Sequence, residues 1–180
     1  MTSRHKVFVS FYHDDQQYKD RFVRMMDGHI VDESVHDEDI DDENLMTETI
    51  RRTIREDFIA DATVTVVLVG ECTWQRKHVD WEIGSSLRHT ETNPRCGLLG
   101  ILLPTHPNYH TDKYDENLVP PRLADNCGRD SYARMYKWSD SPSEVQEWIH
   151  DAFLRRDKIY PDNSRLQFKR NRSGDCSQGW

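Results

Sequence analysis

Five short apolar segments alternate with amphipathic or polar segments along the chain. Residues 6–11 (KVFVSF) and 63–70 (TVTVVLVG) are apolar at most positions, which is typical of strands that are covered on both faces. Residues 97–103 (GLLGILL) have the same character, residues 131–138 predict another strand, and residues 29–34 predict a weak one. The pattern therefore indicates five strands.

Apolar residues at helical spacing lie between most of these strands. Asp14 and Asp15 can cap a first helix, which Gly28 ends. Residues 104–130 lack periodicity and predict a long loop. The other predicted helices cover residues 44–59, 74–90 and 142–156.

Alternation of strands and helices implies a parallel sheet with helices on both faces. The common five-strand solution is the three-layer, flavodoxin-like α/β fold with strand order 2-1-3-4-5. In that fold the ligand crevice lies at the carboxyl ends of strands 1 and 3. Residues 10–14 and 70–74 should therefore line it.

A chain of 180 residues suits one domain. We predict this domain at residues 1–156. Residues 157–180 are polar and lack periodicity, and they predict a mobile tail, although Phe168 and Trp180 could dock on the domain.

The net charge of −8 argues against nucleic acid as a partner. No apolar run approaches the roughly 20 residues that span a bilayer, so no membrane contact is expected. The start of the chain has no apolar signal segment. The four cysteines lie far apart, so neither a disulfide framework nor a zinc site is expected, and a reducing cytoplasm is the simpler interpretation.

Glu82 is the strongest candidate for chemistry. It follows Val79 and precedes Ile83 on the stripe predicted to be buried, so its carboxylate should lie at the edge of the core, beside Trp81. A carboxylate near aromatic rings can hold a sugar or stabilise a cation. From the spacing alone, an ordinary boundary glutamate paired with Arg76 or Arg88 is the simpler interpretation.

The turn after the first strand is the second candidate. Ser10, Phe11 and Tyr12 lead into a helix whose free N–H groups suit a phosphate, and the two aromatic rings could stack on a base. The alternative is that Phe11 belongs to the core and Asp14 only caps the helix.

Metal sites are poorly supported. The acidic segment that starts at Asp37 has the spacing closest to a calcium loop. Position 6 of such a loop needs glycine for its sharp turn, but this segment has Asp42 there, so we expect no metal. The histidines show no ligand spacing, and nothing fixes a histidine partner for Cys72. The five acidic positions that match the calcium loop are Asp37, Asp39, Asp41, Glu43 and Glu48.

Two motifs together resemble the TIR domain family. VFVSF at residues 7–11 is similar to the family's first strand, and TWQRKHVDWEI at residues 73–83 is similar to its helix with W-x-x-x-E. The closer resemblance is to the TIR-like proteins of bacterial Thoeris anti-phage systems, over about residues 5–156. His78 stands where the family usually has Trp, and Trp81 stands where Tyr is usual. The segment at the family's BB loop, residues 32–43, is unusually acidic.

The resemblance implies that the protein cleaves the nicotinamide–ribose bond of NAD, which is a substrate and not a cofactor. Glu82 matches the family's catalytic glutamate. The substrate-binding candidates are Ser10, Phe11, Tyr12 and Trp74, with Arg76 at the pyrophosphate.

The resemblance also implies a product and partners. The product is ADP-ribose or a cyclic or conjugated derivative, and the Thoeris-like match favours a diffusible signal that activates a separate effector. Homo-oligomers are common in the family.

Three other interpretations can be compared with this pattern. A response-regulator receiver has an acidic pair after strand 1, as here, but needs a phospho-accepting Asp after strand 3, where this chain has Gly70 and Glu71. A flavodoxin needs a Gly- and hydroxyl-rich phosphate loop, which residues 10–15 do not form. The serious alternative is a non-catalytic TIR module that only assembles with other TIR domains.

Overall fold

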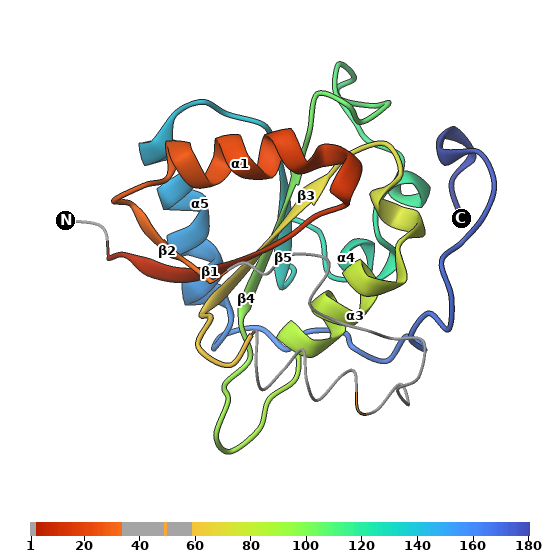
Figure 1. Cartoon of the computed structure of the whole chain (residues 1–180). Helices are drawn as coiled ribbons and strands as arrows, with labels where there is room; N and C mark the ends of the chain where they lie inside the picture. Colours follow the sequence, from red (N-terminus) through yellow and green to blue (C-terminus); the bar gives the residue numbers. More distant parts are fainter. Residues whose placement is uncertain (1–2, 34–48, 50–58) are drawn as a thin grey trace.

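A computed structural model describes residues 3–33, 49 and 59–180 of the chain. Five strands form one parallel sheet in the order β2-β1-β3-β4-β5, which confirms the predicted fold (Figure 1). The strands are β1 (His5–Ser10), β2 (Ile30–Asp32), β3 (Val64–Val69), β4 (Gly97–Leu102) and β5 (Ala133–Lys137).

Helices cover both faces of the sheet (Figure 1). On one face, α1 (Gln16–Met25) and α5 (Pro142–Arg155) pack on the side chains of Val64, Val66 and Leu68. On the other face, α3 (Lys77–Ser86) and α4 (Pro121–Ala124) pack on Val67 and Val69. Because successive strand side chains point to opposite faces, the apolar run of β3 supplies both cores.

The start of α1 differs from the prediction. Neither Asp14 nor Asp15 caps it through its side chain. A short 3-10 turn, η1 (His13–Asp15), precedes α1; the exposed Asp14 pairs with His13, and Asp15 is buried. Asp15 therefore occupies the N-cap position of α1, but its buried side chain bonds to the Thr105 hydroxyl and not to the backbone of the helix.

The helix predicted from residue 74 begins later. Residues of η4 (Thr73–Gln75) form a 3-10 turn, and Arg76 is extended, with φ −89° and ψ 121°, before α3 starts at Lys77. The hydroxyl of Thr73 accepts a hydrogen bond from the Gly70 N–H at 2.9 Å, which holds the turn against the end of β3.

The predicted loop at residues 104–130 holds two short helices, η5 (Glu116–Leu118) and α4. The predicted helix at residues 44–59 and most of the acidic segment 32–43, with its calcium-like spacing, lie outside the described residues. No helix in the described part of the chain is long and apolar enough to cross a bilayer.

Residues 157–180 pack on the domain, where a mobile tail was expected. The segment runs beside α3 and ends in η6 (Cys176–Gln178) and Trp180 (Figure 1). Its backbone makes hydrogen bonds to the domain, as from Arg172 N–H to the Gln75 carbonyl oxygen at 2.8 Å, and Phe168 is buried. The domain boundary at residue 156 stays a prediction.

A disulfide joins Cys72 to Cys176, with their Cα atoms 5.0 Å apart, so the expectation of no disulfide was wrong. The two residues are 104 positions apart in the chain, and spacing gives no sign of such a pair. Cys96 is buried, and its thiol donates a hydrogen bond to the Ala62 carbonyl oxygen at 3.3 Å.

Candidate functional site

The carboxyl end of β1 meets the middle of α3 at Ser10 and Glu82. The Ser10 hydroxyl donates a hydrogen bond to Glu82 Oε2 over 2.5 Å, and Ser10 itself is 1 % exposed. Glu82 is half-buried. The Glu82 carboxylate therefore lies at the carboxyl end of β1, where a buried hydroxyl donates to it.

The neighbours of Glu82 explain its position. Trp81 and Ile83 on either side of it are buried, and the Trp81 indole N–H donates to the Phe168 carbonyl oxygen at 2.8 Å. The Ser86 hydroxyl donates to the Glu82 carbonyl oxygen at 2.8 Å and contacts Thr65 of β3. Contacts of Trp81 and of Ser86 thus hold α3 in place on both sides of the carboxylate.

Arg76 lies over the ring of Tyr12 rather than forming a simple surface pair. Its guanidinium carbon is 3.9 Å from the Tyr12 ring centroid, within cation–π range. Tyr12 is buried, and burial raises the pKa of its hydroxyl group. The Arg76 Nε is buried and has no hydrogen-bond partner among the described residues.

Phe11 belongs to the core, where its ring packs with Val9 and Phe22. Its carbonyl oxygen accepts a hydrogen bond from His78 Nε2 at 3.1 Å. The histidine that replaces the family's usual tryptophan therefore ties α3 to the residue after β1. In this structure Phe11 positions the turn through its backbone.

Trp74 is 3 % exposed because the C-terminal segment covers it. Its indole N–H donates to the Cys176 carbonyl oxygen at 2.9 Å. It also lines an open pocket of about 380 Å³ with residues of that segment. Trp74 therefore lies in η4, before α3 begins, and faces the C-terminal residues.

Asp15 is a buried carboxyl group that the sequence did not single out. It accepts a hydrogen bond from the Thr105 hydroxyl at 2.9 Å, and burial raises its pKa. A side chain at Gly70 would collide with it, so the glycine after β3 makes room for this carboxyl group. The acidic pair after β1 and the glycine after β3 were the sequence features that could have indicated this buried carboxyl group.

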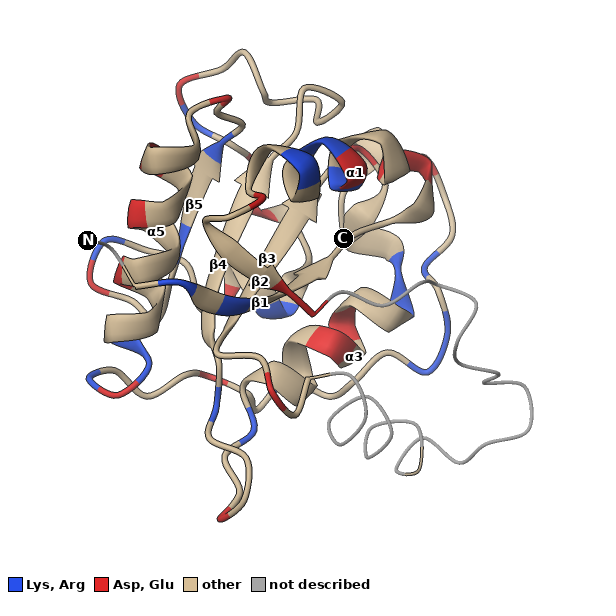
Figure 2. Cartoon of the chain, turned by 60° about the vertical axis from the view of Figure 1, so that its left-hand side comes forward, with Lys and Arg blue, Asp and Glu red and all other residues tan. Residues whose placement is uncertain are grey.

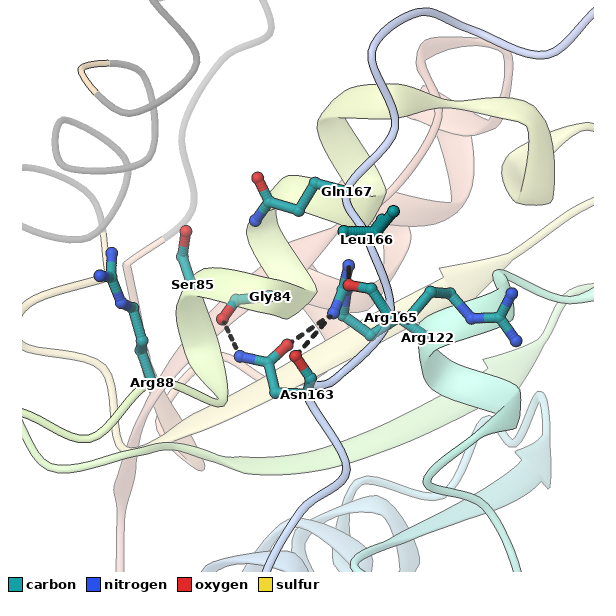
Figure 3. A pocket seen from close by; sticks show the side chains of 8 residues that line it. All are labelled: Gly84, Ser85, Arg88, Arg122, Asn163, Arg165, Leu166 and Gln167. Carbon is teal, nitrogen blue, oxygen red and sulfur yellow. Dashed lines mark hydrogen bonds between the residues drawn. The ribbon is translucent and has the colours of Figure 1, made fainter.

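The C-terminal half of α3 borders a second pocket, of about 280 Å³ (Figure 3). Asn163 bridges its floor, because its amide donates to the Gly84 carbonyl oxygen at 3.0 Å and its oxygen accepts from Arg122 at 2.7 Å. The Ser85 hydroxyl has no hydrogen-bond partner among the described residues. Neither Ser10 nor Glu82 lines this pocket.

No group of three or more His, Cys, Asp or Glu side chains within the described ranges is placed to hold a metal ion. The Ser10–Glu82 and Tyr12–Arg76 contacts both lie between the segment after β1 and the segment around α3.

A parallel sheet in the order 2-1-3-4-5, with a glutamate of α3 at the end of β1, defines an α/β domain of the TIR-like class. Residues 8–108 match the family described as Thoeris protein ThsB, TIR-like domain. This match covers more than half of the chain, so the protein belongs to that family. A comparison with curated proteins gave no match.

Proposed function

We propose that the protein cleaves NAD at the nicotinamide–ribose bond and that Glu82 is the catalytic residue. The observation that carries the proposal is the hydrogen bond from Ser10 to Glu82 at the carboxyl end of β1. Membership of a defence-associated TIR family supports it. A buried hydroxyl that holds a half-buried carboxylate in one orientation suits a site in which charge develops at a fixed position.

The leaving group determines what the protein must supply. When the bond between C1′ of the ribose and the ring nitrogen breaks, the electron pair stays on nitrogen and nicotinamide leaves as a neutral molecule. The positive charge then lies on the ribose as an oxocarbenium-like centre. A carboxylate at Glu82, placed near the ribose hydroxyls, stabilises that charge.

The fate of the ribose decides the product. Attack by water at C1′, with loss of a proton, gives ADP-ribose. Attack by a group of the adenine end, or by another nucleophile, gives a cyclic or conjugated ADP-ribose. In the proposed anti-phage role, such a molecule is the diffusible signal that activates a separate effector in the cytoplasm.

Arg76, Tyr12 and Trp74 complete the proposed site. The guanidinium of Arg76, stacked on Tyr12, is suited to the pyrophosphate because arginine binds phosphate through paired N–H groups. Trp74 borders the same end of α3 from the side of the C-terminal segment. A neighbouring copy of the chain is proposed to complete the pocket in a homo-oligomer.

The test is product analysis with the full chain. Wild-type protein, purified both from resting cells and from phage-infected cells, is incubated with NAD, and nicotinamide and ribose products are measured by mass spectrometry. Glu82→Gln should lower nicotinamide release at least a hundredfold. Glu147→Gln, an exposed glutamate on α5, is the matched control and should keep the wild-type rate. Intact NAD with wild-type protein from both sources would refute the proposal.

A non-catalytic TIR module is the second candidate. The observation that favours it is His78, whose ring replaces a tryptophan and bonds to the backbone after β1. In that case Glu82→Gln would leave phage protection unaltered, whereas the enzyme proposal requires protection to be lost while the protein stays folded.

A further inference from the structure

A pocket of about 380 Å³ separates the start of α3 from the end of the chain, and neither Ser10 nor Glu82 lines it. Two tryptophan side chains border it, Trp74 from η4 and Trp180 from the C-terminal residue. Arg170 and Arg172 line the same space. The pocket therefore combines flat aromatic rings with two positive charges.

The C-terminal segment is fastened on both sides of this pocket. Asn171 Oδ1 accepts a hydrogen bond from the Lys77 N–H at 2.8 Å, at the first turn of α3. The Cys72–Cys176 disulfide and the Trp74–Cys176 hydrogen bond hold the segment further along. The Trp180 N–H donates to the Asn117 carbonyl oxygen at 3.1 Å, and its indole N–H donates to the Val119 carbonyl oxygen at 3.0 Å. The walls are thus held in place without a ligand.

The two arginines of the pocket form no ion pair with a carboxylate of the described residues. Neither Arg170 nor Arg172 makes a hydrogen bond or ion pair through its side chain with any other described residue. Arg172 stacks on the Phe168 ring at 4.5 Å, and no carboxylate side chain lines the pocket among the residues described. The chain as a whole has a net charge of −8, and Figure 2 shows its Lys and Arg positions distributed over the fold.

The surroundings of Arg172 change the pKa of its guanidinium. Burial lowers this pKa most, the nearby Arg165 lowers it further, and the Asp80 carboxylate raises it. Arg165 is itself paired with Asp125.

We propose that this pocket binds a nucleoside monophosphate group, with the base against the exposed indole ring of Trp180 and the phosphate on Arg170 and Arg172. The volume lies within the range of small-ligand sites, about 300–1,000 Å³. Indole rings stack on nucleic-acid bases, and guanidinium groups form paired hydrogen bonds to phosphate oxygens. The site is separate from the proposed NAD-cleaving centre and goes beyond that function.

The first test is titration of the full-length protein with AMP, followed by tryptophan fluorescence and by calorimetry. Arg172→Gln and Trp180→Ala should each weaken AMP binding at least tenfold. Arg24→Gln, an exposed arginine on α1, is the control and should change the affinity less than twofold. Thermal melting followed by circular dichroism shows that each variant is folded; two independent variants keep the test valid if one of them is not.

Two further ligands test the proposed chemistry. Adenosine and inorganic phosphate, each used alone, should bind at least tenfold more weakly than AMP, because each lacks half of the contacts. If inorganic phosphate binds as tightly as AMP, the indole ring of Trp180 plays no part and the proposal is wrong. It is also wrong if wild-type protein does not bind AMP or if Arg172→Gln binds it normally.

The Glu82→Gln variant separates this site from the catalytic centre. It should bind AMP as the wild type does, and loss of AMP binding in this variant would place the ligand at Glu82 and overturn the proposal. Because this variant should not turn NAD over, NAD can compete with AMP on it. Displacement of AMP by NAD identifies the dinucleotide as the source of the group, and AMP that NAD does not displace identifies a free mononucleotide; both results support the site.

Discussion

The hydroxyl of Ser10 and the carboxylate of Glu82 come from positions 72 apart in the chain, and their contact depends on how α3 crosses the end of β1. Spacing on α3 was enough to place Glu82 at the edge of the core, because Val79 and Ile83 mark the buried stripe. The end of the first strand was enough to place Ser10 at the carboxyl edge of the sheet. Neither pattern could predict their hydrogen bond, since no local rule links the two segments.

Ser10→Ala should lower the rate of nicotinamide release about tenfold. A hydrogen bond to a charged group contributes about 1.5–3 kcal/mol, and a factor of ten in rate corresponds to about 1.4 kcal/mol. The change removes the hydroxyl that orients Glu82 and keeps the carboxylate. Steady-state assays with NAD measure the effect.

The control for that variant is Ser143→Ala on the exposed start of α5, which should keep the wild-type rate. An unchanged rate in Ser10→Ala would show that the contact does not orient a reacting group. The melting temperatures of the two variants must agree within a few degrees for the comparison to hold.

At the scale of elements, the apolar runs of the sequence predict the strands, whereas no hydrophobic periodicity predicts the structure of the segment after β4. The predicted loop at residues 104–130 is ordered by specific polar contacts. His106 is buried, and its Nδ1 accepts a hydrogen bond from the Asn108 N–H at 3.1 Å. Its Nε2 must then carry the proton, which it donates to the Leu118 carbonyl oxygen at 3.0 Å. The periodicity of a sequence cannot predict hydrogen bonds of this kind between a side chain and the backbone.

His106 should make the protein less stable as the pH falls below about 6.5. Burial lowers the pKa of the folded imidazole, so the unfolded chain binds a proton first, and the free energy of unfolding decreases from pH 6.5 down to the folded pKa. His106→Gln should lose less stability than the wild type between pH 7 and pH 5. Urea unfolding at both pH values measures the difference.

The control in the same loop is His110→Gln, since His110 is exposed. It should keep the full pH dependence of the wild type. Burial also lowers the pKa of His5, so some pH dependence must remain in His106→Gln. Equal slopes for the two variants would contradict the role given to His106.

At the scale of the whole molecule, the C-terminal segment is part of the folded domain because main-chain groups and one buried ion pair bind it. The Asp80 carboxylate accepts hydrogen bonds from Arg122 Nε and from the Phe168 N–H, both at 2.9 Å. Arg122 also donates to the Asn163 side chain at 2.7 Å and to the Arg165 carbonyl oxygen at 2.8 Å (Figure 3). A polar segment with no apolar period was predicted to be loose, because sequence patterns do not report contacts of this kind.

Asp80→Asn should therefore lower the free energy of unfolding by about 3 kcal/mol, since it leaves a buried guanidinium without its counter-charge. Both side chains of the pair are at most 2 % exposed. The matched control is Asp140→Asn, which breaks an ion pair with Arg21 whose side chains are 56 % and 61 % exposed, and it should cost less than about 1 kcal/mol. Urea denaturation of the full chain measures both. A loss in Asp80→Asn as small as in the control would show that the segment is held by its disulfide and backbone contacts alone; a large loss, with easier proteolysis after residue 156, would show that the α3–α4 ion pair anchors the end of the chain.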